Sequence, residues 1–255
     1  QELVSSIDKA SGLLQIVNYN VEPTQYVVAG DLVSLTALMY ACDAVKKSKT
    51  TPDTVSIVTL AVEQARADQA QAGENKVTLR RGSATIPLEG IDVPFHSRFL
   101  RSGVSHFRSI LESKFTAEKM VPERFEGWYI PNLVAKPFSL SRSFVENVQS
   151  VADSPILANL LEDWDAHVAT NKAQACATLL IELLAYQFAS PVRWIETVDV
   201  LLCQAETRKV CELGPAPVLT NMLKVALAKN PRYSSLHGQM ECLSYALDSN
   251  KIYFR

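Results

Sequence analysis

Apolar and polar positions in the first thirty residues alternate with the period of β-strands. Residues 13–20 and 25–30 predict two short strands, separated by a turn at Glu22 and Pro23. Asp31 is placed to cap a following helix, whose apolar positions recur at helical spacing: Leu35, Leu38, Met39, Cys42 and Val45.

A second helix is predicted to begin at Thr51 and Pro52, with the capping residue before a proline at the first helical position. Gly73 is placed to terminate it, and its buried stripe is expected to be Val55, Val58, Val62 and Ala65. Residues 77–79 and 84–88 return to strand character. The pattern therefore predicts a small α+β unit over residues 13–88.

Beyond residue 96 the pattern becomes mostly helical. Ser154-Pro155 and Ser190-Pro191 each predict a helix start, and residues 175–184 are apolar on nearly all sides, which predicts an enclosed helix. Residues 171–174 have the least regular pattern, and residues 210–213 predict a short central strand that ends at Gly214. Helices alternating with brief strands are typical of an α/β layer architecture.

Composition, net charge and cysteine spacing argue against several classes of function. The 255 residues are 47% hydrophobic, enough for a core, and the net charge of -2 argues against a nucleic-acid partner. Five widely spaced cysteines show no zinc or disulfide pattern and favour reduced thiols in a cytoplasmic protein, and no metal site is expected. No apolar run reaches the 18–20 residues or so that a membrane span requires, and no signal peptide is visible.

His96 is the residue most suggestive of chemistry. An apolar segment delivers it directly after Val93, Pro94 and Phe95, and a helical pattern follows from Arg98. At such a junction one ring nitrogen is able to face a pocket while the other is held from behind, as general-base catalysis requires. The alternative is a structural histidine beside apolar residues.

Five segments occur in the order found in one family of acyltransferases. They are Val-Asn-Tyr-Asn at 17–20, Gln-Tyr-Val-Val-Ala-Gly-Asp at 25–31, Val-Pro-Phe-His-Ser at 93–97, Tyr-Ile-Pro-Asn-Leu-Val-Ala-Lys-Pro-Phe at 129–138 and Tyr-Gln-Phe-Ala-Ser-Pro-Val-Arg-Trp at 186–194. Together with Cys-Glu-Leu-Gly-Pro at 211–215, they resemble the later part of the malonyl/palmitoyl transferase domain of fungal-type fatty acid synthases, a malonyl-CoA:acyl-carrier-protein transferase.

This resemblance implies a fold class: α/β, the later part of an α/β-hydrolase-like acyltransferase domain with an inserted ferredoxin-like α+β subdomain. The expected parts are the ferredoxin-like subdomain at residues 1–88, the C-terminal part of the acyltransferase core at 89–235, and a segment at 236–255 that leads toward a following domain.

The family's nucleophile is a serine in a Gly-x-Ser-x-Gly turn, and this motif occurs nowhere in the chain. The nearest approach, Gly-Val-Ser-His-Phe at 103–107, lacks the second glycine and lies in a predicted helix, so Ser105 and His106 are expected to have no catalytic role. The nucleophile, and the arginine that pairs with the malonyl carboxylate, are therefore expected in a segment upstream of this one.

The resemblance also implies roles for residues of this chain. His96 is the catalytic base, oriented by a main-chain carbonyl that maps onto Gln187, where a helix end leaves carbonyls unpaired. Phe95 lines the acyl pocket and disfavours an α-methyl branch, unless it packs in the core instead. Asn20 and Asn132 are expected near the substrate.

No cofactor is expected on this segment; its substrates are CoA thioesters, malonyl-CoA first, and the phosphopantetheine of an acyl carrier protein. The expected partners are the rest of the acyltransferase domain and the other synthase domains, in a large cytoplasmic oligomer. Two alternatives stay open: a non-catalytic half-domain that only stabilises the assembly, and the related acetyl-transferase domain of the same synthases.

Overall fold

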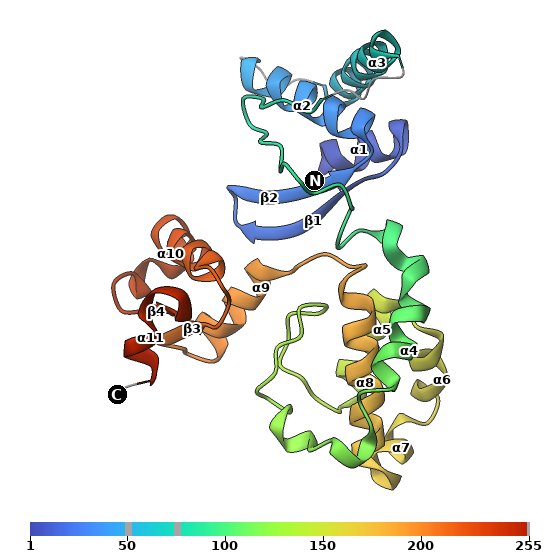
Figure 1. Cartoon of the computed structure of the whole chain (residues 1–255), viewed down its shortest axis with the longest axis vertical. Helices are drawn as coiled ribbons and strands as arrows, with labels where there is room; N and C mark the ends of the chain where they lie inside the picture. The colour runs from blue at the N-terminus through green and yellow to red at the C-terminus, as the bar shows by residue number, and fades with distance from the viewer. Residues whose placement is uncertain (49–52, 74–77, 254–255) are drawn as a thin grey trace. The chain divides into compact units, whose positions relative to one another are not determined.

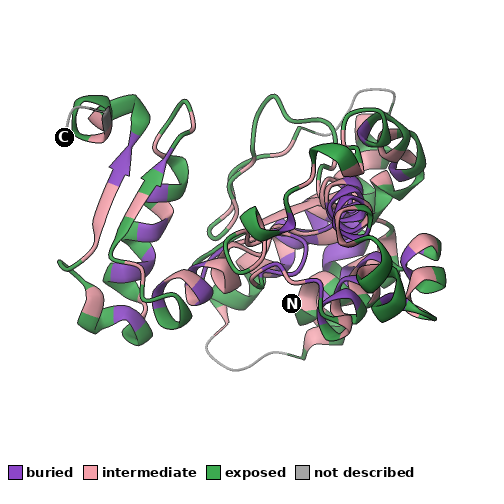
Figure 2. Cartoon of the chain, turned by 90° about the horizontal axis from the view of Figure 1, so that it is seen from below, coloured by how far each residue is buried: buried purple, intermediate pink, exposed green. Residues whose placement is uncertain are grey.

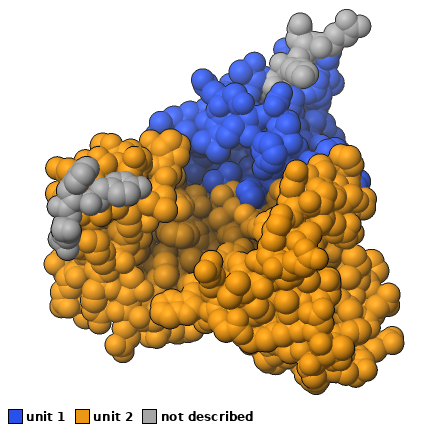
Figure 3. Space-filling model, turned by 60° about the horizontal axis from the view of Figure 1, so that its bottom comes forward, with its two compact units in different colours: residues 1–17, 27–102 blue, residues 18–26, 103–255 orange. Residues whose placement is uncertain are grey.

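The structure, a computed structural model, describes residues 1–48, 53–73 and 78–253. Residues 1–17 and 27–102 form one compact unit, and residues 18–26 and 103–255 form a second one (Figure 3). Strands β1 (Leu14–Val21) and β2 (Gln25–Gly30) pair with each other (Figure 1). Both strands contribute residues to both units.

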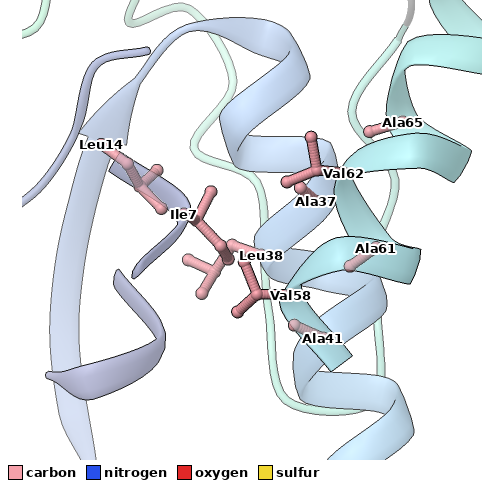
Figure 4. Packing of buried hydrophobic residues seen from close by; sticks show 9 residues of the cluster. All are labelled: Ile7, Leu14, Ala37, Leu38, Ala41, Val58, Ala61, Val62 and Ala65. Atoms are coloured by element: carbon pink, nitrogen blue, oxygen red, sulfur yellow. The ribbon is translucent and has the colours of Figure 1, made fainter. Parts of the chain in front are cut away.

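The first unit is a helical layer beside the N-terminal half of β1. Helices α1 (Glu2–Ser11), α2 (Leu32–Lys47) and α3 (Thr54–Ala72) pack against one another. Their shared core is aliphatic and is shown in Figure 4; it consists of Ile7, Leu14, Ala37, Leu38, Ala41, Val58, Ala61, Val62 and Ala65. Gly12 joins α1 to β1 with φ of 127°, and a β-carbon there would lie 2.6 Å from the Asp31 carboxylate, so the junction requires glycine.

The second unit is built around α8 (Lys172–Gln187), which is buried along most of its length (Figure 2). Helices α4 (Val104–Glu112), α5 (Arg142–Ala152) and α7 (Trp164–Thr170) pack on it, and α6 (Pro155–Leu161) packs on α5 and α7. The short 3-10 helices η2 (Ala117–Lys119) and η3 (Pro122–Arg124) also contact α8.

The C-terminal part of this unit contains α9 (Trp194–Asp199), the π-helix η4 (Val200–Gln204), α10 (Val218–Lys229) and the 3-10 helix η5 (Pro231–Leu236). Strands β3 (Lys209–Glu212) and β4 (Glu241–Ser244) pair in parallel, with Lys209 opposite Glu241, and α11 (Tyr245–Tyr253) follows. A second core, which includes Val21, Val198, Leu223 and Tyr233, joins the end of β1 to α9, α10 and η5.

Many of the predicted elements are confirmed. Both N-terminal strands and the following helix form as expected, and Gly73 ends α3 with φ of 61°. Ser154 caps α6 with Pro155 at its first position, and the enclosed helix over 175–184 lies within α8. The strand predicted at 210–213 is β3, but β4 is its only neighbour in the part of the chain that the structure describes, so β3 is not central there.

Other local predictions are wrong. Residues 78–79 and 84–88 form no strand, while residue 77 lies outside the described residues. Asp31 occupies the N-cap position of α2, as predicted, but its side chain makes no capping hydrogen bond; its carboxylate accepts a hydrogen bond from the Leu13 amide at 2.8 Å. Val55 is 71% exposed rather than part of the buried stripe of α3.

Further predictions also need correction or stay open. Ser190-Pro191 starts no helix, since α9 begins at Trp194. Asn171, in the segment with the least regular pattern, caps α8 by accepting a hydrogen bond from the Gln174 amide at 3.0 Å. The expected helix start at residues 51–52 lies outside the described residues, and the residue that caps α3 is Asp53. The predicted fold class and the three predicted domain ranges stay predictions.

Candidate functional site

His96 lies in a tight turn of the first unit, and its backbone adopts the left-handed conformation with φ of 63°. The Ser97 amide and hydroxyl both donate to the Pro94 carbonyl, at 3.2 and 2.7 Å, which closes this turn. A non-glycine residue in this region of backbone space costs on the order of 1–3 kcal/mol, and such residues cluster at functional sites. The histidine indicated by the sequence pattern is thus one of four non-glycine residues with a positive φ among the described residues, together with Ala135, Asp153 and Glu206.

Arg98 anchors this turn to the junction between α1 and β1. Its amide donates to the Gln15 side-chain oxygen at 2.9 Å, and its guanidinium donates to Asp8 at 2.6 Å. Burial raises the pKa of the Asp8 carboxyl, but the hydrogen bonds from Arg98 and from the Leu14 amide outweigh it and hold the pKa below its usual value. The turn that carries His96 is therefore held by an ionised carboxylate.

Phe95 and the residues before it are not arranged as predicted. No strand leads into His96, whereas the helical pattern predicted from Arg98 is confirmed by the 3-10 helix η1 (Arg98–Gly103) and by α4, which follows it. Phe95 is 54% exposed, so the alternative that it packs in the core of this chain is wrong. Its predicted place in an acyl pocket stays a prediction.

In the second unit, Gln187 is the last residue of α8. The Tyr186 carbonyl accepts a hydrogen bond from the Ala189 amide at 3.1 Å, and the Gln187 carbonyl accepts one from the Ser190 amide at 3.4 Å. The expectation that the Gln187 carbonyl is unpaired is thus wrong. In general, a carbonyl oxygen has two lone pairs and is able to accept two hydrogen bonds.

The segment that follows, residues 190–193, binds the two segments that carry the other predicted residues of this unit. The Tyr19 amide of β1 donates to the Val192 carbonyl at 2.9 Å, and the Arg193 amide donates to the Asn132 side chain at 3.1 Å. Asn20, at the end of β1, is 9% exposed. Asn20 and Asn132 therefore lie on two segments that both bind residues 190–193.

The five predicted residues are thus divided between the units: Phe95 and His96 belong to the first, and Asn20, Asn132 and Gln187 belong to the second. Within the second unit, the segment after Gln187 connects to the segments of Asn20 and Asn132. Ser190, in that segment, is 2% exposed, and its hydroxyl has no hydrogen-bond partner among the described residues.

Sequence reasoning missed an ion pair inside the second unit. Glu182 of α8 is fully buried and accepts two hydrogen bonds from the Arg108 guanidinium of α4, at 2.5 and 2.9 Å. A signal was present, because Glu182 is the only charged residue from 175 to 187. A lone carboxylate in an otherwise apolar, enclosed helix requires a buried partner.

Other chemistry is limited in the described residues. They contain no cluster of histidine, cysteine, aspartate or glutamate that could hold a metal ion, and none of their helices is long and apolar enough to cross a membrane. A pocket of about 420 Å³ lies between α2, α3 and residues 78–80, where the Tyr40 hydroxyl donates to Asp68 at 2.5 Å and accepts from Arg80 at 2.9 Å.

The comparisons with known proteins point to one group of enzymes. The chain is 44% identical over 229 residues, 89% of its length, to fatty acid synthase 2 of Mycosarcoma maydis. It is 40% identical over 168 residues to the fatty acid synthase subunit beta of Schizosaccharomyces pombe, and 35% identical over 179 residues to that of Saccharomyces cerevisiae. These two matches cover 61% and 66% of the chain.

The chain spans only 6%, 8% and 9% of the length of these three relatives, respectively. No protein-family model matches it. The chain is therefore homologous to a short segment of fungal fatty acid synthases.

Proposed function

We propose that this chain, a homologue of one short segment of fungal fatty acid synthases, is the later part of the malonyl/palmitoyl transferase of such a synthase. The observation that carries the proposal is His96 in a strained, left-handed backbone conformation, within the Val-Pro-Phe-His-Ser segment and on a turn anchored by Arg98.

In this proposal His96 is the general base of acyl transfer between thioesters. A serine from the remainder of the acyltransferase domain attacks the malonyl-CoA carbonyl while His96 takes its proton. The CoA thiolate leaves as the acyl-serine forms, and His96 returns the proton to it. His96 then deprotonates the phosphopantetheine thiol of the acyl carrier protein, and the thiolate attacks the acyl-serine. As the bond between the acyl carbon and the serine oxygen breaks, His96 gives the proton to this oxygen, which regenerates the serine hydroxyl.

The other predicted residues have supporting roles. The Gln187 main-chain carbonyl accepts a hydrogen bond from the imidazole and fixes its tautomer. Exposed Phe95 is available to line the acyl pocket of the complete domain. Asn20 and Asn132 lie near the substrate. Asn132 also holds the segment after Gln187 through its side chain, and Asn20 follows Tyr19, whose amide binds the same segment. The chain acts in a large cytoplasmic oligomer together with the other synthase domains.

The test is His96→Ala in the full-length synthase, with malonyl loading measured per assembled particle. We expect a loss of about 10²–10⁴-fold, the usual contribution of general acid–base catalysis, with assembly unchanged. His106→Ala, which alters an exposed histidine on α4, is the matched control and should load malonyl normally. Normal loading by His96→Ala, or a loss that only follows reduced assembly, would contradict the proposal.

A further inference from the structure

The buried carboxylate of Glu182 is the charged group that the proposed mechanism does not use. Its two oxygens accept hydrogen bonds from Arg108, and one of them also accepts a hydrogen bond from the Ser154 hydroxyl at 2.6 Å. Glu182 and Ser154 are both fully buried, and the Arg108 side chain is 12% exposed. All three residues belong to the second unit.

This network connects four helices. Arg108 belongs to α4 and Glu182 belongs to α8. The Ser154 hydroxyl caps α6, because it accepts hydrogen bonds from the Ile156 and Leu157 amides, each at 3.2 Å. The Ser154 amide in turn donates to the Gln149 side chain of α5 at 3.0 Å. One carboxylate of α8 is therefore linked directly to α4 and, through Ser154, to α6 and α5.

The network also reaches the last turn of α8. The Arg108 guanidinium carbon lies 5.7 Å from the ring centroid of Tyr186, within the range of a cation–π contact. Tyr186 immediately precedes Gln187. Arg108 thus contacts α8 at Glu182 and, one turn later, at the residue before the proposed orienting carbonyl.

Stability alone does not explain an ion pair in this position. Replacing a buried pair with apolar side chains of similar volume is often neutral or stabilising, because desolvation of the charges offsets their attraction. A bidentate arginine–carboxylate pair does offer fixed geometry, since two parallel hydrogen bonds define a single relative orientation.

On the basis of the proposed function, we infer that Arg108 and Glu182 are positioning residues, which hold the last turn of α8 so that the Gln187 carbonyl points at the catalytic base. They contact neither substrate nor reacting atoms. Their loss should therefore lower kcat for malonyl loading and leave the KM for malonyl-CoA unchanged.

The test uses the full-length synthase and three variants of the pair. Glu182→Gln should lower kcat by about tenfold or more, because a displacement near 1 Å costs up to about 10²-fold. Arg108→Lys keeps the charge but loses the bidentate geometry, so its kcat should fall between those of the wild type and Glu182→Gln. The double variant Arg108→Met/Glu182→Met should regain thermal stability, as apolar replacements do, but not kcat.

Lys172→Ala is the matched control. It breaks exposed ion pairs with Glu123 and Glu126 at the opposite end of the same helix, roughly 22 Å from Gln187 at 1.5 Å per residue. Its kcat should equal that of the wild type. A stable double variant with wild-type kcat would overturn the inference and show that the pair only supports the fold.

Two other outcomes are also decisive. If the double variant does not fold, the single variants decide, and a kcat that follows thermal stability alone in Arg108→Lys and Glu182→Gln would overturn the inference. A wild-type synthase that loads no malonyl would instead overturn the proposed function, and the positioning role with it.

Discussion

At the residue scale, the neighbouring residues from Pro94 to Arg98 differ in backbone conformation and in exposure to solvent. His96 has a positive φ, Ser97 is fully buried and closes the turn, and Phe95 is left exposed. A phenyl ring that is more than half exposed gives up hydrophobic stabilisation unless something else covers it. In the proposed function an acyl group and the rest of the domain provide that cover.

Phe95→Ser tests this assignment. The variant should lower the malonyl-to-methylmalonyl ratio of specificity constants by about tenfold, because a hydrophobic pocket discriminates one methyl group by only about 1–3 kcal/mol. Loss of a buried ring would cost about 3–5 kcal/mol, but Phe95 is exposed, so the thermal midpoint of this chain should hardly change.

The matched control is Phe99→Ser, which removes a ring that is 65% exposed on η1 and has no predicted contact with the acyl group. It should leave the ratio as in the wild type. An unchanged ratio in a well-folded Phe95→Ser variant would remove Phe95 from the site.

Among the elements, strand β3 and helix α10 are joined by a buried carboxylate. Glu212 ends β3, is 8% exposed, and accepts hydrogen bonds from the Leu219 and Thr220 amides, both at 2.9 Å, and from the Thr220 hydroxyl at 2.8 Å. These are amides in the first turn of α10, which an ordinary helix leaves without partners in its own backbone. The Glu212 side chain of β3 therefore caps the N-terminus of α10.

Glu212→Gln should lower the free energy of unfolding at pH 7 by about 1–2 kcal/mol, the usual loss for a helix cap. Burial raises the pKa of Glu212, but the hydrogen bonds from α10 outweigh it and leave the pKa below its ordinary value. The carboxylate therefore stabilises the fold above the unfolded pKa of about 4.3, and this contribution is lost as the pH falls through the lower folded pKa.

Urea titrations of the wild type and Glu212→Gln between pH 7 and pH 3 check this sign. The difference between the two should shrink toward acid pH. Glu241→Gln is the control, because it alters a surface ion pair between Lys209 of β3 and Glu241 of β4. It should change the free energy of unfolding by less than about 1 kcal/mol at any pH. A difference that grows toward acid pH would contradict the prediction.

At the scale of the whole molecule, the predicted site residues are divided between two compact units. The sequence contains no Gly-x-Ser-x-Gly motif. The 255-residue chain alone should therefore transfer no malonyl group to an acyl carrier protein. Co-production with the segment that carries the nucleophile should restore transfer, measured with labelled malonyl-CoA. The same pair with His96→Ala is the control, and robust turnover by the chain alone would show that the nucleophile lies within it.

Features that depend on neighbours in the sequence were determined by the sequence itself. The strands β1 and β2, the helices α2 and α8, the glycine that ends α3 and the serine–proline start of α6 follow from periodicity and capping. The pattern around His96 predicts a functional residue, which stays a prediction, and the backbone at His96 is left-handed.

Features that depend on distant partners were decided only by the tertiary structure. Residues 84–88 have strand character but no ladder, because a strand needs a hydrogen-bonded neighbour that local pattern does not supply. The Ser190-Pro191 signal fails for a related reason, since Val192 bridges to Asn18 of β1 and extends the chain there. The hydrogen-bond donors that contact Asp31, Glu182 and Glu212 are also decided by the tertiary structure. A carboxylate binds whichever donors the fold brings to it, and sequence spacing does not specify these donors.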